Sequence, residues 1–390
     1  MTARKPLRIA MVAGEVSGDL LGADLIKALK LHHPDIEIYG IGGPRMIEQG
    51  FRSLYDMERL AVMGLVEVLG RLGELLKIRK TLRDQLISDP PDAFVGIDAP
   101  DFNTDLELKL KKAGIPTLHY VSPTVWAWRG YRIKKIRQAV DHMLVVFPFE
   151  MKFYEKQHMR ATFVGHPAAN ETPEVIDKTG ARKALALPID KDVIALLPGS
   201  RGSELSRHAE LFVDSVVRIH ARYPDAVFAL PFAKPQLRQA FLDAIGKREQ
   251  QSLPIVYFDG RSREVLAAAD VALLASGTAA LEAALMRTPM VVTYRMNPLS
   301  AWLIKRFAHV KLFSMPNNLA GHELVPEFIQ EKATADNLSS SVCRFLEDSA
   351  RRQHVTRELS GIYTQLRCES GKLAAEAVLS EVRLSRDEKQ

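Results

Sequence analysis

The sequence has little of what marks several common protein classes. It contains two cysteines in 390 residues, Cys343 and Cys368, both in helical-looking sequence, so neither a disulfide framework nor a zinc site is expected. No apolar run is long enough to span a bilayer, and strand-like sequence begins at Leu7 with no signal peptide before it. No carboxylate cluster has the spacing of a metal site, and neither a metal nor a cofactor is expected. These absences favour a reducing cytoplasm.

The length and net charge of the chain indicate its number of domains and the kind of partner it binds. A chain of 390 residues suggests two domains, because single cores rarely grow past roughly 250–300 residues. The net charge of +6 suits phosphorylated substrates or an anionic membrane surface. No nucleic-acid-binding motif accompanies that charge, so nucleic acid is not expected as a partner.

The first half alternates strand-like and helix-like sequence. Residues 7–13 predict a strand, and the Gly-containing turn at residues 14–19 leads into a helix from about Leu20. The turn lacks the G-x-G-x-x-G spacing, which disfavours a nicotinamide cofactor. The alternation predicts a mostly parallel sheet with ligands beyond the carboxyl ends of its strands. Further strands are expected at residues 36–41, 93–97, 117–121, 143–147 and 162–164.

A second series of the same kind follows an expected linker at residues 165–180. It begins with a strand at residues 193–197, which runs into a Gly-containing turn at residues 198–204. From Ala333 onward the sequence is helical and charged. Further strands of this half are expected at residues 226–230, 255–258, 271–274 and 290–294.

Residues 271–285 predict a buried strand, a tight loop and a helix that begins near Thr278. The unpaired N–H groups at the start of such a helix carry the positive end of its dipole. With Gly277 allowing close approach, this is a candidate phosphate site, and Glu282 lies where it could accept hydrogen bonds from a ribose. The alternative is that Thr278 only caps the helix and Glu282 is solvated.

Two loops in the first half carry candidate chemistry. Asp98 ends the strand at residues 93–97 and is placed as a general base, although it could instead cap the next helix. Trp126 and Trp128 follow the next strand, and they are expected to line a cleft or shield an apolar ligand. Arg129 opens a basic cluster that faces either phosphate or solvent.

Residues 62–76 predict an amphipathic helix with a wide apolar face. Its basic continuation suits an interfacial helix, whereas the pattern alone favours a helix packed on the core. Gly64, Gly70 and Gly73 weaken the helix. Residues 298–310 form a second apolar and basic segment of similar character.

Eight segments together closely resemble the lipid-A-disaccharide synthases, and the likeness runs over nearly the whole chain. The segments are AGEVSGDLLG (residues 13–22), GGP (42–44), GIDAPDFN (96–103), YVSPTVWAWR (120–129), FVGHP (163–167), LPGSRGSE (197–204), SGTAALEAAL (276–285) and PNNLAGHELVPE (316–327).

The resemblance implies an α/β protein of the GT-B fold, with two Rossmann-like doubly wound domains facing a central cleft. Residues 1–168 would bind the acceptor, residues 169–340 the UDP-sugar, and helices in residues 341–390 would cross back to the first domain. The implied reaction joins UDP-2,3-diacylglucosamine to 2,3-diacylglucosamine 1-phosphate, with inversion, to give the β-1,6-linked disaccharide 1-phosphate and UDP. The enzyme would act at the cytoplasmic face of the inner membrane by peripheral contact, and a homodimer stays open.

The resemblance also implies residue roles. Asp98 would take the proton from the acceptor's 6-hydroxyl, and Arg201 would offset charge on the departing UDP. The expected nucleotide-sugar residues are Ser200, Arg201, Ser276, Gly277, Thr278, Glu282 and Asn317. The expected acceptor and lipid residues are Glu15, Ser17, Gly18, Asp19, Trp126, Trp128, Arg129, Val66, Val68, Leu69 and Leu72. The rival interpretations are a UDP-sugar 2-epimerase of similar architecture and a non-enzymatic basic membrane-surface protein.

Overall fold

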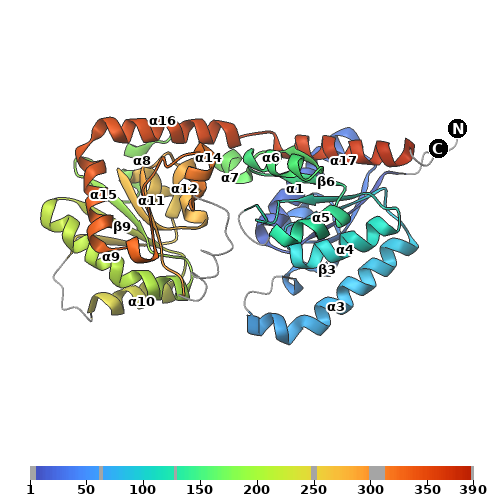
Figure 1. Cartoon of the computed structure of the whole chain (residues 1–390), viewed down its shortest axis with the longest axis horizontal. Helices are drawn as coiled ribbons and strands as arrows, with labels where there is room; N and C mark the ends of the chain where they lie inside the picture. Colours follow the sequence, from blue (N-terminus) through green and yellow to red (C-terminus); the bar gives the residue numbers. More distant parts are fainter. Residues whose placement is uncertain (1–5, 61–64, 127–129, 247–252, 298–311, 388–390) are drawn as a thin grey trace. The chain divides into compact units, whose positions relative to one another are not determined.

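The structure is a computed structural model that describes residues 6–60, 65–126, 130–246, 253–297 and 312–387. The chain divides into two compact units (Figure 1). Unit 1 comprises Met1–Pro167 and Leu366–Gln390, and unit 2 comprises Ala168–Gln365. The end of the chain therefore returns to the unit in which it began.

Unit 1 is built on a parallel seven-stranded sheet with the order β3-β2-β1-β4-β5-β6-β7. The central strands β1 and β4 read as continuous apolar runs because both of their faces are buried. The winding reverses between β1 and β4, which makes their carboxyl ends the topological switch point where ligands of such sheets bind. The strands are β1 (Arg8–Ala13), β2 (Glu37–Gly42), β3 (Arg52–Asp56), β4 (Ala93–Ile97), β5 (Thr117–Tyr120), β6 (His142–Val145) and β7 (Arg160–Phe163).

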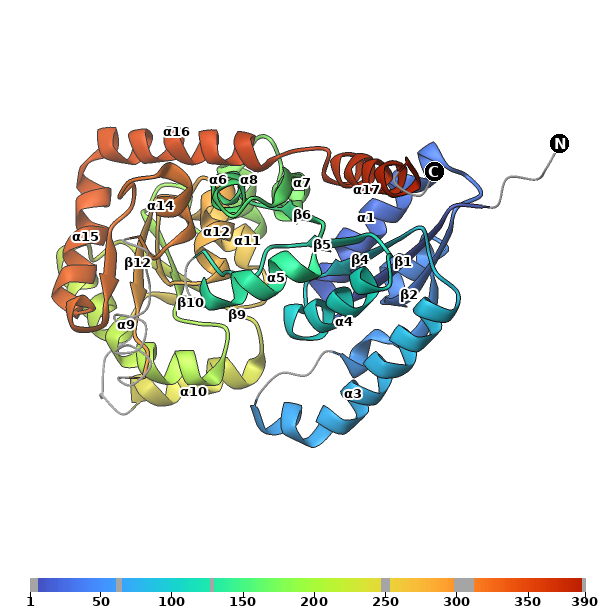
Figure 2. The same ribbon diagram turned by 45° about the vertical axis from the view of Figure 1, so that its right-hand side comes forward.

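Helices cover the sheet of unit 1. Figure 2 shows the C-terminal helix α17 beside α1, and Ala374, Ala375 and Val378 of α17 belong to the same core as the residues of β1. The helices are α1 (Val16–His32), α2 (Pro44–Glu48), α3 (Leu65–Ser88), α4 (Pro100–Lys112), α5 (Ile133–Ala139), α6 (Phe149–Lys156) and α17 (Ser370–Asp387), with short 3-10 turns η1 (Met57–Arg59) and η2 (Gly130–Arg132).

Unit 2 repeats the plan with a parallel six-stranded sheet of order β10-β9-β8-β11-β12-β13. The strands are β8 (Val193–Leu197), β9 (Val227–Phe232), β10 (Ile255–Asp259), β11 (Val271–Ala275), β12 (Met290–Tyr294) and β13 (Glu327–Ile329). The helices are α7 (Pro167–Glu171), α8 (Lys178–Ala184), α9 (Gly202–Arg222), α10 (Pro235–Gly246), α11 (Ser262–Ala268), α12 (Thr278–Leu285), α14 (Met315–Ala320), α15 (Ala335–Glu347) and α16 (Ser349–Leu366), with the 3-10 turn η3 (Gln330–Lys332).

Four local expectations need correction. The expected linker at residues 165–180 contains α7 and the start of α8, and the first helix begins at Val16 instead of Leu20. Cys368 lies in the connection between α16 and α17, outside any helix. The edge strands β3 and β13 were not expected from the sequence. β3 alternates between exposed and half-buried residues, and β13 is three residues long, so neither presents a continuous apolar run.

Candidate active site

A pocket of about 450 Å³ lies at the carboxyl ends of the strands of unit 2. It is formed where β8, β9 and β11 end and where α9, α11 and α12 begin. Six of the seven residues expected to bind the nucleotide-sugar line it: Ser200, Arg201, Ser276, Gly277, Thr278 and Glu282.

Two glycines shape the turns of this pocket. Gly277 precedes α12 with φ 145° and ψ −149°, a conformation that only glycine adopts readily. An added Cβ on Gly277 would meet nothing within 4 Å, so the space above the helix start is open to a ligand. Gly199 has φ +139°, and an added Cβ there would lie 2.7 Å from the Cβ of Glu204. Both turns therefore depend on the absence of a side chain.

Glu282 reaches the pocket from the second turn of α12. Its Oε2 accepts a hydrogen bond from the Ser262 hydroxyl at 3.4 Å, which links it to the start of α11. Burial raises the pKa of Glu282, although Arg263 and the Ser262 hydroxyl oppose the shift. A half-buried carboxylate with one weak partner can accept hydrogen bonds from the hydroxyls of a bound ribose.

Arg201 is the N-cap of α9, and its side chain is 70% exposed. Glu204 lies one turn further along, where Oε2 accepts from the Ser200 N–H at 3.1 Å and Oε1 lies 3.4 Å from Arg201 Nη1. The carbonyl of Glu204 is in turn hydrogen-bonded to the ring of His208 at 2.8 Å. Glu204 therefore holds the turn that presents Arg201 to the pocket.

Asn317 does not line this pocket, unlike the other six residues. Its side chain is fully buried, and Nδ2 donates to the Val325 carbonyl at 2.9 Å and to Glu327 Oε1 at 2.8 Å. Its Oδ1 accepts from the N–H groups of Leu324 and Val325, both at 2.9 Å. All of its hydrogen-bonding capacity is used within unit 2, so it organises the loop after α14 instead of presenting donors to a diphosphate.

Asp98 follows β4 at the switch point of unit 1. Asp98 and Ala99 have φ values of 53° and 44°, a left-handed conformation that is uncommon for residues other than glycine. Oδ1 accepts from the Ala99 N–H at 2.9 Å, and Oδ2 lies 3.4 Å from the hydroxyl of Ser17 on α1. Two consecutive strained residues at the carboxyl end of a strand are typical of a functional turn. Such strain persists only where the surrounding structure holds it, and it clusters at active sites.

The sequence predicts that the neighbouring acid, Asp101, caps a helix beginning near Phe102, because Asp is a favoured N-cap residue. The N-cap of α4 is Ala99, and Asp101 lies in the first turn, where it forms an ion pair with Arg132 at 2.8 Å. The cap assignment is therefore wrong, although Asp101 remains favourably placed near the positive end of the helix.

The expected acceptor residues on α1 have different surroundings. Glu15 is the exposed N-cap residue of α1, and Ser17 is the neighbour of Asp98. Gly18 is buried, and an added Cβ would make an ordinary contact of 3.4 Å with the Ala13 side chain. Asp19 is buried and accepts from the N–H groups of Gly43, Arg45 and Met46 at 2.9 to 3.1 Å. Its carboxylate therefore caps α2.

The structure describes only part of the loop that contains Trp126 and Trp128, and only some of the side chains of α3. The half-buried ring of Trp126 packs edge-on against Phe149, with 4.7 Å between the ring centroids. Leu72 is on α3 and is 43% exposed. Trp128 and Arg129, and the side chains of Val66, Val68 and Leu69 on α3, lie outside the described residues.

Comparison with known proteins shows the family to which this chain belongs. Residues 9–379 match the lipid-A-disaccharide synthetase family. The chain is 49% identical over 375 residues to the lipid-A-disaccharide synthase of Pseudomonas syringae pv. syringae (strain B728a), covering 96% of this chain and 97% of that protein. The synthase of Azotobacter vinelandii is also 49% identical, over 374 residues with the same coverage. The chain belongs to the lipid-A-disaccharide synthetase family. It is a glycosyltransferase of lipid A biosynthesis.

Solved structures of other enzymes share the fold. A putative UDP-N-acetylglucosamine 2-epimerase from Listeria monocytogenes matches with a TM-score of 0.62 and 13% identity, covering 99% of this chain and 98% of that one. MurG from Acinetobacter baumannii matches with a TM-score of 0.57 and 14% identity, covering 96% and 100%. At such low identity the likeness shows the GT-B fold alone, so the epimerase matches say nothing about the reaction of this family member.

The sequence did not single out Ser262, Gly260 or Phe232, which also line the pocket of unit 2. Gly260 and Ser262 follow β10 in another strand, turn and helix arrangement, which was a usable signal. Phe232 ends β9 and resembles any core residue in the sequence.

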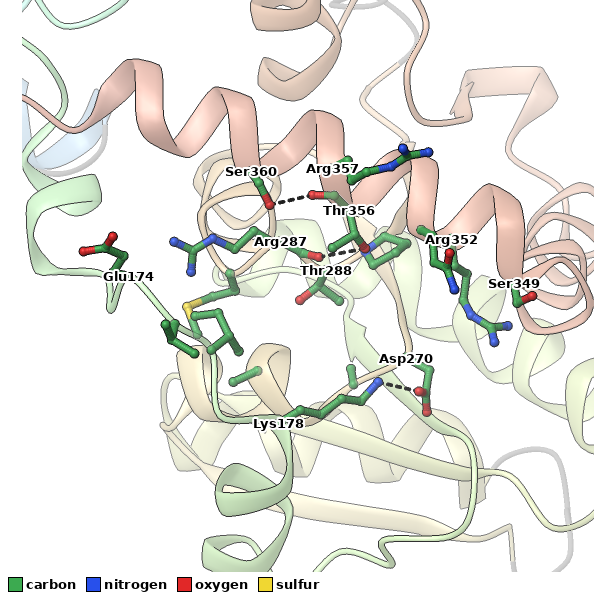
Figure 3. Close-up of a pocket in the computed structure, with 17 residues that line it drawn as sticks. Glu174, Lys178, Asp270, Arg287, Thr288, Ser349, Arg352, Thr356, Arg357 and Ser360 are labelled. Atoms are coloured by element: carbon green, nitrogen blue, oxygen red, sulfur yellow. Dashed lines mark hydrogen bonds and ion pairs between the residues drawn. The ribbon is translucent and has the colours of Figure 1, made fainter.

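A larger cavity of about 800 Å³ lies at the opposite edge of the same sheet, before β11 and β12 begin (Figure 3). Three of the four lysine and arginine side chains that line it are engaged by protein atoms. Lys178 pairs with Asp270 at 2.5 Å, Arg352 donates to the Leu346 carbonyl at 2.6 Å, and Arg287 lies over the ring of Tyr363 at 3.7 Å. None of the expected site residues lines it, so the smaller pocket is the nucleotide candidate.

In the part of the chain that the structure describes, no group of three or more His, Cys, Asp or Glu side chains could hold a metal ion. Within the same ranges, none of the helices combines the length and the apolar character that a bilayer-spanning segment needs.

Proposed function

We propose that this family member transfers 2,3-diacylglucosamine from its UDP derivative to the 6-hydroxyl of 2,3-diacylglucosamine 1-phosphate. The observation that carries this proposal is the pocket of unit 2, where two strand-to-helix turns and Glu282 converge. The start of α12 and Arg201 would bind the diphosphate, and Glu282 would bind the ribose. The relatives named lipid-A-disaccharide synthase support the choice of sugar.

The chemistry assigned to unit 1 is deprotonation of the acceptor. As the acceptor oxygen forms its bond to the anomeric carbon, its proton passes to an Asp98 carboxylate oxygen. The bond between the anomeric carbon and UDP breaks, and UDP leaves with the electron pair. Attack from the face opposite UDP inverts the configuration to β. Arg201 and the N–H groups at the start of α12 would offset the charge on the departing diphosphate.

The lipid-side proposal rests on the two halves of α3. Ile78, Leu82 and Leu86 are buried, whereas Leu72 and Leu76 are 43% and 46% exposed. Arg79, Lys80, Arg83 and Lys109 line a small cavity together with Leu76. Exposed leucines beside a group of cations suit acyl chains and anionic headgroups. The part of α3 around Leu72 and Leu76 is therefore the proposed site of peripheral contact with the inner membrane.

The test is a reaction with both acylated sugars, followed by mass analysis. The expected products are the disaccharide 1-phosphate and UDP, with UDP release dependent on the acceptor. Release of UDP from the donor alone, with no disaccharide formed, would instead support the epimerase interpretation. No binding of UDP at all would favour a non-enzymatic surface protein.

A further inference from the structure

A buried histidine, His208, lies four residues after Glu204 on α9 and has no part in the mechanism above. Its side chain is fully buried. Ring atom Nδ1 is 2.8 Å from the Glu204 carbonyl oxygen, and ring atom Nε2 accepts a hydrogen bond from the Arg295 N–H at 2.9 Å. Arg295 directly follows β12, whereas α9 follows β8, and β11 separates these two strands in the sheet. The ring therefore joins two elements that are not neighbours in the sheet.

The two partners of the ring fix its protonation state. The Glu204 carbonyl can only accept a hydrogen bond, so Nδ1 carries the proton. The Arg295 N–H can only donate, so Nε2 carries none. The imidazole is neutral while both bonds hold. Burial lowers the pKa of His208, and the charges of Arg295 and Arg207 act in the same direction, against Glu204.

On the α9 side, His208 is bonded to the residue that holds the first turn of the nucleotide pocket. The carbonyl of Glu204 accepts from the ring, and its carboxylate accepts from the Ser200 N–H at 3.1 Å and lies 3.4 Å from Arg201 Nη1. The side chain of Glu204 is 16% exposed. The position of His208 is thus connected to Ser200 and Arg201 through one residue.

On the β12 side, the ring is bonded to the support of the second turn. Ser276, which lines the pocket, donates its N–H to the Thr293 carbonyl at 2.8 Å, two residues before Arg295. The Thr293 hydroxyl donates to the Phe328 carbonyl at 3.0 Å, and the Arg295 side chain donates to the Ala333 carbonyl. The end of β12 is held from three sides, and the turn at Ser276 is attached to it.

A buried helical residue that only satisfies its own polar atoms would have simpler contacts. Ser215 on the same helix is such a case: its buried hydroxyl donates to the Leu211 carbonyl, four residues back, at 2.7 Å. His208 makes the corresponding bond to Glu204 and adds a second bond to Arg295 on another element. The second bond is what distinguishes His208 from a core residue.

We propose that His208 is a positioning residue for the nucleotide, because its neutral ring fixes the spacing of the two turns that bind the diphosphate. These turns are residues 199–204 and 276–278. The inference rests on the nucleotide role proposed for this pocket. Hydrogen bonds weaken steeply away from their preferred geometry, so one diphosphate can bond well to both turns only at a set spacing. A spacing fixed before binding also avoids the cost of ordering the turns on binding.

Two amide substitutions separate the two bonds of the ring. In His208→Gln the amide lies near the place of Nε2, so its oxygen can still accept from the Arg295 N–H. In His208→Asn the amide lies near the place of Nδ1, so the bond to Arg295 is lost. Titration calorimetry should find UDP binding about three- to tenfold weaker in His208→Asn and within about twofold of wild type in His208→Gln. The KM of the acceptor should not change, since the acceptor is assigned to unit 1.

Ser215→Ala is the matched control. It removes a buried bond of the same kind two turns further along α9, and Ser215 does not line the pocket. This variant should lower the melting temperature and leave UDP affinity unchanged. If His208→Asn binds UDP as tightly as wild type, or if the two His208 variants lose affinity equally, the positioning role is wrong. Absence of UDP binding by the wild type is a separate result: it would refute the nucleotide assignment, and this inference with it.

A measurement on the wild type covers the case in which His208→Asn does not fold. NMR of ring-labelled histidine at neutral pH should show a proton on Nδ1 of His208 and none on Nε2. Addition of UDP should slow hydrogen exchange of the Arg295 amide, because the bound diphosphate and the bond to His208 stabilise each other. A proton on Nε2, or Arg295 exchange that does not respond to bound UDP, would overturn the inference.

Discussion

Asp98 and Ala99 adopt left-handed backbone conformations that cost roughly 1–3 kcal/mol each, so the surrounding contacts must hold them there. Asp98→Asn keeps the shape of the side chain and removes its basicity. Because general-base catalysis is typically worth about 10²–10⁴-fold, turnover should fall within that range under saturating substrates while UDP affinity holds. Steady-state kinetics with both sugars measures the first quantity, and titration calorimetry with UDP the second.

Asp101→Asn is the control for that measurement. Asp101 is three residues further along and pairs with Arg132 at the surface, so its loss should have a far smaller effect on turnover. Equal losses of turnover in the two variants would mean that turnover depends on the negative charge of this turn and not on Asp98 as a specific general base.

Glu282 and Arg201 approach the same pocket from α12 and the turn before α9. A hydrogen bond to a charged group contributes about 1.5–3 kcal/mol, so Glu282→Ala and Arg201→Ala should each weaken UDP binding roughly tenfold or more. Arg218→Ala is a suitable control, since Arg218 lies on the same helix α9 and pairs at the surface with Asp336. Calorimetry that finds wild-type affinity in both pocket variants would rule out the nucleotide assignment.

The positions of the functional turns could be predicted from the sequence, whereas the contacts made by individual side chains could not. Strand-turn-helix patterns indicated the sites of Asp98, Arg201 and Gly277, because such turns gather at the carboxyl edge of a parallel sheet. The same reasoning could not distinguish a free carboxylate or amide from an engaged one. Asp19 caps α2, and Asn317 bonds a loop eight residues away; both depend on contacts that no local pattern reveals.

At the scale of elements, α3 is the helix whose role the sequence left open. Its second half packs on the sheet through Leu82, whereas Leu72 and Leu76 of the first half are exposed. Replacing Val66, Val68, Leu69 and Leu72 by Ser should therefore reduce sedimentation with anionic vesicles while leaving the melting temperature nearly unchanged. The reason is that apolar side chains in contact with lipid add membrane affinity without adding to the core.

Leu82→Ser provides the contrast, because a large buried side chain contributes about 2–5 kcal/mol to stability. That variant should unfold at a lower temperature and, while folded, still sediment with vesicles. A comparable drop in melting temperature in the four-residue Ser variant would show instead that the first half of α3 packs on the core.

The interior strands were predictable, and so were the edge strands β7 and β10, but the edge strands β3 and β13 were not. β1, β4, β8 and β11 are buried on both faces and read as continuous apolar runs. The edge strands β3 and β13 owe their existence to pairing with β2 and β12, a tertiary contact that short and partly polar segments do not indicate.

At the scale of the whole molecule, the fold class followed from two alternating series of strands and helices, as the two parallel sheets and the structural neighbours confirm. The return of the C-terminal helix to the first unit is also confirmed, whereas the expected linker at residues 165–180 is partly helical. The segment at Gly165 and His166 lies beside the start of the returning chain, where the His166 N–H donates to the Leu366 carbonyl at 2.9 Å. An added Cβ on Gly165 would lie 2.6 Å from the Cβ of Cys368.

His166 makes this junction sensitive to acid. Burial lowers its pKa from 6.5 to about 4, and its ring stacks on Phe147 with 5.4 Å between centroids. Because the folded pKa is depressed, the folded protein binds fewer protons than the unfolded chain between about pH 6.5 and pH 4. The contribution of His166 to the free energy of unfolding is therefore complete above pH 6.5 and falls, by up to about 3 kcal/mol, as the pH drops through that window.

Glu150 opposes this trend, so the comparison must separate the two groups. Burial raises the pKa of Glu150 from its ordinary value of 4.5 to about 7. The contribution of Glu150 to the free energy of unfolding therefore increases as the pH falls from 7 toward 4.5. Denaturant unfolding of wild type and His166→Gln at pH 7 and pH 4.5 isolates His166, because Glu150 is present in both proteins. The variant should lose less stability on acidification than wild type, by a margin of up to about 3 kcal/mol. An equal loss in both proteins would show that His166 remains accessible to protons at the junction.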